Sequence, residues 1–498
     1  MKKKAFLKGA AVIAAGGFLS KLVGAIYKIP LTNLIGGYGL GLYQMAYPIY
    51  CLLLTVSATG IPSSIACLTA ERISRGEREE PLVKTSLKLF CAIGLVGTLL
   101  MAVLAPLLSA AQSERGLVGG YFALAPSVVL VSAISVFRGV FQGRANMLPT
   151  AISEIVEQLV KASLGLVFAW RYHGDIYKAV TLLLLAVSVS EAVALVYIIV
   201  AYFRAKKGEK SQKDGGRVGL KTVLTLSVPV TLSSSLFPLS SLVDSVLVVR
   251  LLGGYAENAV SLYGLFAGAA TTIVGLPSSV CYGLAAASIP SVAAARGTGD
   301  TAELKKRVWY ALMITLVIST VFAVGTYAFA GFAVDVVFRG LSASDRALVA
   351  EMVRGLSIGV VFLCGTQTLS ACLTAQKKPK HSFYSAAVAI AVKTLITVVL
   401  VSNPRFSVFG AVIASNACYF LDFLCNLLYN GKVLKEQSEG NDDDNGSGSG
   451  RRKRRFNFKR QASDLGGSAS GQADRMPYGE HAILPKRGRT RRGAPNAR

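Results

Sequence analysis

Ionisable residues lie inside several long apolar stretches of this chain. A charge at membrane depth is costly, so such residues usually face a cavity, a partner or a substrate. The candidate binding residues chosen on this ground are Lys21, Lys28, Glu154, Glu157, Lys161, Asp244, Arg250 and Lys393.

Two lysines share one face of the first apolar stretch. Lys21 and Lys28 are seven residues apart, which is close to two helical turns. A cationic face inside a cavity suits an anionic group such as a pyrophosphate. The alternative for Lys28 is that its ammonium group extends to the outer membrane interface.

The fifth apolar stretch carries a charged strip. Glu157 and Lys161 have i,i+4 spacing, and Glu154 lies one turn earlier on nearly the same face. One interpretation is an internal salt bridge that only stabilises the helix. The other is a strip that lines a cavity, in which the second carboxylate takes up a proton.

Motifs of soluble enzymes are absent. The sequence contains no G-x-x-x-x-G-K-[ST] and no H-E-x-x-H, and none of its eight Cys forms a CxxC pair. We therefore expect no enzymatic activity, no cofactor and no metal site.

The elements that position these residues are membrane helices. The chain of 498 residues is 52% hydrophobic and only 16% charged, whereas soluble domains have about 25% charged residues. Apolar stretches long enough to cross a bilayer recur up to about Asn430. They predict an all-α polytopic membrane protein with twelve spans, at 6–27, 41–69, 85–109, 119–142, 149–170, 178–203, 219–249, 259–289, 308–332, 350–374, 381–402 and 407–430.

The loop charges predict the orientation. The formal net charge is +26, and Lys and Arg gather in every second loop, most densely between 204 and 217. This alternation follows the positive-inside rule if both termini are cytoplasmic. Loop placement thus explains the basic pI, and we expect no nucleic-acid partner.

An internal repeat divides the predicted helices. Residues 34–38, 42–43 and 60–64 recur as 251–255, 262–263 and 275–279, at a nearly constant offset. The offset spans six helices, an even number, so the repeats are parallel. They predict six-helix bundles at 1–210 and 211–432 around a central cavity, which favours a transporter over a channel.

The repeat also brings polar residues into correspondence. Alignment on Gly-Gly-Tyr places Asp244 opposite Tyr27, at equivalent depth in the first helix of each bundle. Arg250 has the alternative role of an interface anchor. Lys393 has that of an ion-pair partner for a carboxylate on another helix.

The C-terminal segment 433–498 has a different composition. It is acidic, then Gly/Ser-rich, and then strongly basic at 451–455. We expect it to be disordered and cytoplasmic, with its basic cluster on anionic membrane lipid. Contact with RNA or a ribosome, or a merely solvated tail, are the alternatives.

The first two spans carry a family resemblance, in residues 19–24, 34–36, 42–44 and 60–62. Over about 5–430 the chain resembles the polysaccharide-flippase branch of the multidrug/oligosaccharidyl-lipid/polysaccharide exporter superfamily. Within that branch it is similar to the stage V sporulation protein B-like proteins of Gram-positive bacteria, which are relatives of the lipid II flippase. Members often have fourteen helices, and here the last two are replaced by the basic tail.

The resemblance implies two six-helix lobes and alternating access in a bacterial plasma membrane. It implies an undecaprenyl-pyrophosphate-linked sugar as substrate, H⁺ or Na⁺ as the coupling ion, and pyrophosphate contact by Lys21 and Lys28. Two other functions stay open, a cation-coupled multidrug exporter of the same fold and a non-transporting scaffold for envelope synthesis.

Overall fold

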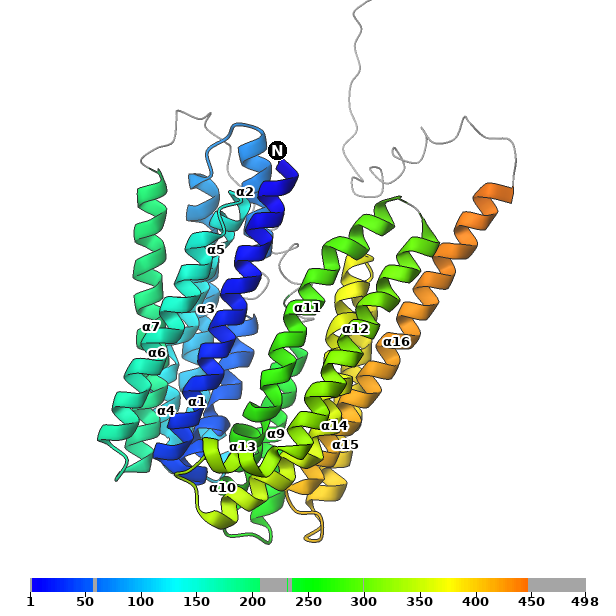
Figure 1. The fold of residues 1–498 in the computed structure, drawn as a ribbon. Coiled ribbons are helices and arrows are strands. Elements are labelled where there is room, and N and C mark those ends of the chain that lie inside the picture. Colours follow the sequence, from blue (N-terminus) through cyan, green and yellow to red (C-terminus); the bar gives the residue numbers. More distant parts are fainter. Residues whose placement is uncertain (1, 57–60, 207–230, 232–234, 299, 447–498) are drawn as a thin grey trace, which may run out of the picture. The chain divides into compact units, whose positions relative to one another are not determined.

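The computed structural model describes residues 2–56, 61–206, 231, 235–298 and 300–446. Every regular element within these ranges is a helix, and none is a strand (Figure 1). Nine of the described helices or helix groups are long and apolar enough to cross a membrane. Helix α6 (Leu148–Arg171) is not among these nine, and it carries the charged strip at 154–161.

The first predicted span and the start of the second form one element, α1 (Lys2–Leu54), with non-helical backbone at Gly36. Tyr27 and Tyr43 line the same cavity, although a straight helix would separate them by about 24 Å. The chain therefore reverses at Gly36, and α1 consists of two arms. Gly36 has a φ of 67°, which glycine adopts without steric cost. Helix α2 (Ile61–Ser74) follows the second arm.

The other helices of the first half match the predicted spans closely. They are α3 (Glu80–Ala111), α4 (Val118–Leu124), α5 (Pro126–Gly143), α6 and α7 (Ile176–Lys206). Helices α4 and α5 share one span, which the short η2 (Arg115–Leu117) opens. Pro126 begins α5, where its missing N–H leaves no new unsatisfied donor.

The second half begins with α9 (Leu236–Gly253), so the predicted span 219–249 lies partly outside the described residues. It continues with α10 (Ala259–Gly264), the π-helical η3 (Leu265–Ala270), α11 (Thr271–Thr298), α12 (Thr301–Ala328), α13 (Ala330–Val337), α14 (Ala343–Ala375), α15 (Pro379–Val401) and α16 (Phe409–Gly446). Helix α16 continues past residue 432, and Val433 and Leu434 are buried. The tail beyond 446 lies outside the described residues.

Helix α1 packs against both halves of the bundle. In Figure 1 it runs alongside α6, and it also contacts α7 in its own half and α9, α10, η3 and α11 in the other. The contact with α10 is close because it is made by glycines. A Cβ on Gly264 would lie 2.3 Å from the carbonyl oxygen of Gly37, and one on Gly41 would lie 2.1 Å from that of Val260. Small residues allow membrane helices to approach in this way.

We predict that Gly264→Ala destabilises the protein. The added methyl group would overlap the Gly37 backbone, and overpacking of this kind costs about 1–3 kcal/mol. The measurement is the Tm of the purified protein in detergent. Gly431→Ala is the control, because a Cβ there meets nothing within 4 Å. Equal Tm values for the two variants would show that the contact does not hold the halves together.

Candidate functional site

A cavity of about 310 Å³ lies where the two arms of α1, helix α6 and the start of α11 meet. Its lining residues are Gly24, Tyr27, Lys28, Tyr43, Tyr47, Lys161, Thr271, Thr272, Gly275 and Ser279. None of them is acidic, and all the polar side chains among them can donate hydrogen bonds. We call this space the cationic cavity.

Lys28 and Lys161 give the cavity its charge. They come from α1 and α6, and each charge acts on the other. Within the described part of the chain, neither ammonium group lies within 4 Å of a carboxylate. Two like charges in a poorly hydrated site repel each other, and an anion that contacts both would relieve this repulsion.

Glu157 is turned away from Lys161 and pairs with another helix. Its Oε2 accepts a hydrogen bond from Arg138 Nη2 at 3.0 Å, and Arg138 Nε also donates to Ser153 Oγ at 2.9 Å. The internal Glu157–Lys161 salt bridge, one of the two interpretations from sequence, is not formed. Glu154 is half-buried on the same helix, and its charge acts on Arg138.

Glu191 on α7 was missed by the sequence analysis. It is 2% exposed, and its Oε1 accepts a hydrogen bond of 3.0 Å from Tyr50 Oη. Its Oε2 has no hydrogen-bond partner among the described residues. The charges of Glu157, Arg138 and Lys161 all act on it. The available signal was a lone carboxylate in the apolar stretch 178–203.

The second half contains a separate ion pair. Lys393 on α15 pairs with Asp244 on α9, and its ammonium group also donates to Ser240 Oγ at 3.3 Å. Lys393 therefore has the carboxylate partner on another helix that sequence offered as its alternative role. Neither residue lines the cationic cavity.

Arg250 lies at the end of the molecule where α1 reverses. Its Nε donates to the carbonyl oxygen of Ala111 at 2.7 Å, which joins α9 to the end of α3. Two more hydrogen bonds link the halves at this Gly36 end, from Gln112 to Ser245 at 3.1 Å and from Asn33 to the carbonyl oxygen of Val337 at 2.9 Å. Arg250 is thus part of a contact between the halves and does not line the cationic cavity.

The structure brings together Lys28 and Lys161 but not all the sequence candidates. Lys21 lies in α1, and its side chain is outside the described residues. No cluster of three or more His, Cys, Asp or Glu side chains that could hold a metal occurs in the described part.

Comparison with solved structures identifies the fold. An inward-facing multidrug resistance MATE family transporter of the MOP superfamily superposes with a TM-score of 0.73 at 17% identity, covering 84% of this chain and 96% of that one. An outward-facing MATE transporter superposes with a TM-score of 0.64 at 16% identity, over 87% and 96%. The predicted fold class is confirmed: twelve membrane helices in two repeated bundles around a central cavity, the seventh lying partly outside the described residues.

Curated relatives cover most of the chain. Stage V sporulation protein B of Bacillus subtilis (strain 168) is 28% identical over 83% of this chain and 81% of its own length. Lipid II flippase MurJ of the same organism is 21% identical over 87% and 83%.

Two family models match the sequence. MatE matches residues 229–399. The model described as polysaccharide biosynthesis protein matches residues 6–295, which is more than half of the 498 residues. The chain therefore belongs to the polysaccharide biosynthesis protein family.

Proposed function

We propose that this protein is a flippase for a polyprenyl-pyrophosphate-linked sugar, either lipid II or a polysaccharide repeat unit. The observation that carries the proposal is the cationic cavity, in which Lys28 and Lys161 have no carboxylate partner among the described residues. The names of the relatives, a lipid II flippase and a sporulation protein, agree with a substrate used in the cell envelope.

The headgroup binds through its pyrophosphate. One ammonium group contacts each phosphate, and the surrounding Tyr, Thr and Ser hydroxyl groups donate to the remaining oxygens. A bound pyrophosphate separates two like charges that otherwise repel each other. The cavity therefore gains more from this anion than from a neutral sugar.

Transport follows alternating access in a bacterial plasma membrane. With both termini in the cytoplasm, the Gly36 end faces outward, and its hydrogen bonds between the halves form the outer closure. The headgroup enters from the cytoplasmic side, and the closure breaks when the site opens outward. A membrane potential adds about 2.3 kcal/mol per charge per 100 mV.

The coupling ion is a proton, and Glu191 is its binding site. The Glu191 Oε2 atom is buried without a hydrogen-bond partner among the described residues. A buried, unpartnered negative charge is costly, and a bound proton removes that charge. Loss of this negative charge also alters the field on the neighbouring Arg138–Glu157 pair. Binding of a proton at Glu191 thus changes the electrostatic field on α6, the helix that carries both Glu157 and Lys161.

The cationic cavity argues against the multidrug alternative, although the solved MATE structures share the fold. An exporter of organic cations would need an acidic, aromatic-lined cavity. This cavity is lined by tyrosines, but none of its lining residues is acidic. Here two lysines would repel such a substrate. The scaffold alternative rests on the basic part of the tail, which lies beyond residue 446 and outside the described residues.

We predict that Lys28→Ala and Lys161→Ala each lower transport by about 10- to 100-fold, the equivalent of one charge-assisted hydrogen bond. The assay measures lipid II headgroup exposure on cells that are depleted of their native flippase and express this chain. Arginine at either position keeps the charge and should retain more activity than alanine. Lys178→Ala is the matched control, because Lys178 lies over the Tyr172 ring outside the cavity.

Two outcomes would count against this proposal. If the intact, inserted chain leaves lipid II inside, lipid II is not the substrate, and other polyprenyl-linked sugars are tested next. If both lysine variants transport normally, the cationic cavity is not the headgroup site.

We predict that Glu191→Gln uncouples transport from protons. Glutamine keeps the size of the side chain and its acceptor for Tyr50, but it does not titrate. In proteoliposomes with an imposed pH gradient, the variant should lose substrate-dependent proton flux and the acceleration by the gradient. Glu71→Gln, at an exposed i,i+4 pair, is the control. If a sodium gradient alone accelerates transport, and does so equally in Glu191→Gln and Glu71→Gln, the coupling ion is Na⁺ and not a proton at Glu191.

A further inference from the structure

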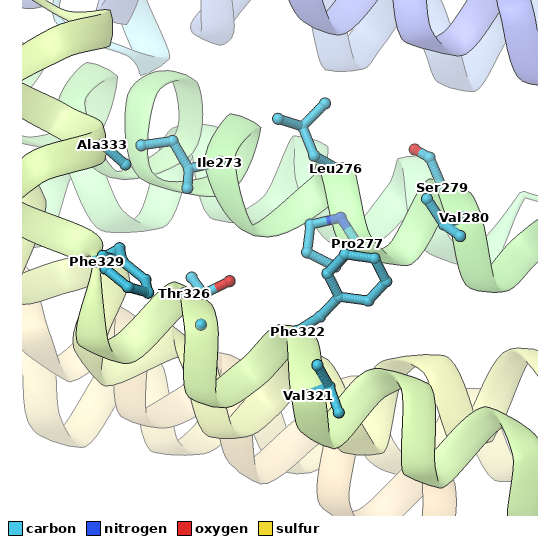
Figure 2. Close-up of a pocket in the computed structure, with 11 residues that line it drawn as sticks. Ile273, Leu276, Pro277, Ser279, Val280, Val321, Phe322, Thr326, Phe329 and Ala333 are labelled. Atoms are coloured by element: carbon cyan, nitrogen blue, oxygen red, sulfur yellow. The ribbon is translucent and has the colours of Figure 1, made fainter.

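A second cavity, of about 490 Å³, lies between α11 and α12–α13. Figure 2 shows Leu276 and Pro277 of α11 on one side and Phe322 of α12 on the other, with Phe329 near the end of α12. Its lining is almost wholly apolar, and Ser279 and Thr326 are the only hydroxyl side chains among the lining residues. We call this cavity the α11–α12 groove.

A single helix, α11, lies between the groove and the cationic cavity and lines both. Thr272, Gly275 and Ser279 of α11 line the cationic cavity, while Ile273, Leu276 and Val280 line the groove. Each set follows the i,i+3/i+4 spacing of one helix face. Ser279 lines both spaces, so the two cavities flank α11 and share this residue.

We propose that the α11–α12 groove holds the first isoprene units of the substrate's polyprenyl chain while the pyrophosphate lies between Lys28 and Lys161. This proposal rests on the proposed function. A ligand that joins a multiply charged anion directly to a hydrocarbon chain matches a two-lysine cavity and an apolar groove that share Ser279.

The groove serves to position the polyprenyl chain. Burial of the chain there adds little to the affinity for the substrate. Lipid chains are already as apolar as leucine, so moving a polyprenyl chain from the bilayer into the groove gives a small hydrophobic gain. What the groove supplies is a fixed path for the chain beside α11. A cavity of this volume is in the range of small-ligand sites and holds only the part of the chain near the headgroup.

Gly325 provides a direct test. It lines the groove, and a Cβ built on it meets nothing within 4 Å. Gly325→Phe therefore places a phenyl ring in the groove, and its Cβ atom does not clash with any neighbouring residue. Gly431→Phe is the matched control, because Gly431 is also helical with open space at its Cβ but lies outside both cavities.

The experiment compares two probes, inorganic pyrophosphate and undecaprenyl pyrophosphate, on purified full-length protein. We expect both to bind the intact chain. Gly325→Phe should weaken binding of the lipid probe at least about tenfold, the size of an overpacking effect, and leave pyrophosphate unchanged. Lys28→Ala should weaken both probes.

The outcomes separate the two proposals. If the intact chain binds neither probe, the proposed function fails. If Lys28→Ala weakens both probes but Gly325→Phe binds the lipid like the intact chain, the proposed function stands and the groove assignment is overturned.

A second measurement identifies the occupant. A photoreactive group in the first isoprene unit should label peptides of α11 and α12. If a photoreactive phospholipid labels them equally and undecaprenyl pyrophosphate does not displace it, the groove holds bulk lipid and the assignment is wrong.

Discussion

The arrangement of this protein depends on how it handles charge inside a membrane. Arg138 and Glu157 neutralise each other between α5 and α6, and Asp244 and Lys393 do so between α9 and α15. Breaking such a buried pair would leave a charge that costs several kcal/mol. These pairs therefore join α5 to α6 and α9 to α15. The two cavity lysines stand apart from this pattern, because within the described part of the chain neither ammonium group lies within 4 Å of a carboxylate.

Backbone features of the two halves form the cavity in which these two lysines lie. Gly36 allows α1 to reverse, so that both of its arms reach the cavity, and Gly41 and Gly264 allow the second arm to lie directly on α10. The π-helical η3 follows α10 and leads into the Thr271–Thr272 wall of the cavity. Such π segments are frequent at functional sites because they change which side chains a helix presents. The cavity is thus formed by close backbone contacts and one irregular helix.

Sequence patterns predicted the helices well because their signal is local. Hydropathy and the repeat predicted the spans and the two repeated bundles. The cost of a charge at membrane depth selected Lys28 and Lys161 among eight candidates. The ion-pair partners that a residue finds on other helices were harder to predict from sequence. The i,i+4 spacing of Glu157 and Lys161 describes neighbours on one helix, whereas in the folded protein Glu157 pairs with Arg138 on α5. Glu191 was passed over for a related reason, since a single carboxylate has no spacing pattern to detect.

The packing of Tyr27 against Gly165 has a mechanical consequence. A Cβ at Gly165 would lie 2.3 Å from Tyr27 Oη, so α1 and α6 are held in one register at this point. Lys28 follows Tyr27 on α1, and Lys161 lies one turn before Gly165 on α6. The same register therefore sets the separation of the two ammonium groups. A slide of α1 by one helical turn, about 5.4 Å, would turn a two-point grip on an anion into a one-point grip. In the proposed function, release of the headgroup would then need only a shift of α1 along α6, with both lysines still charged.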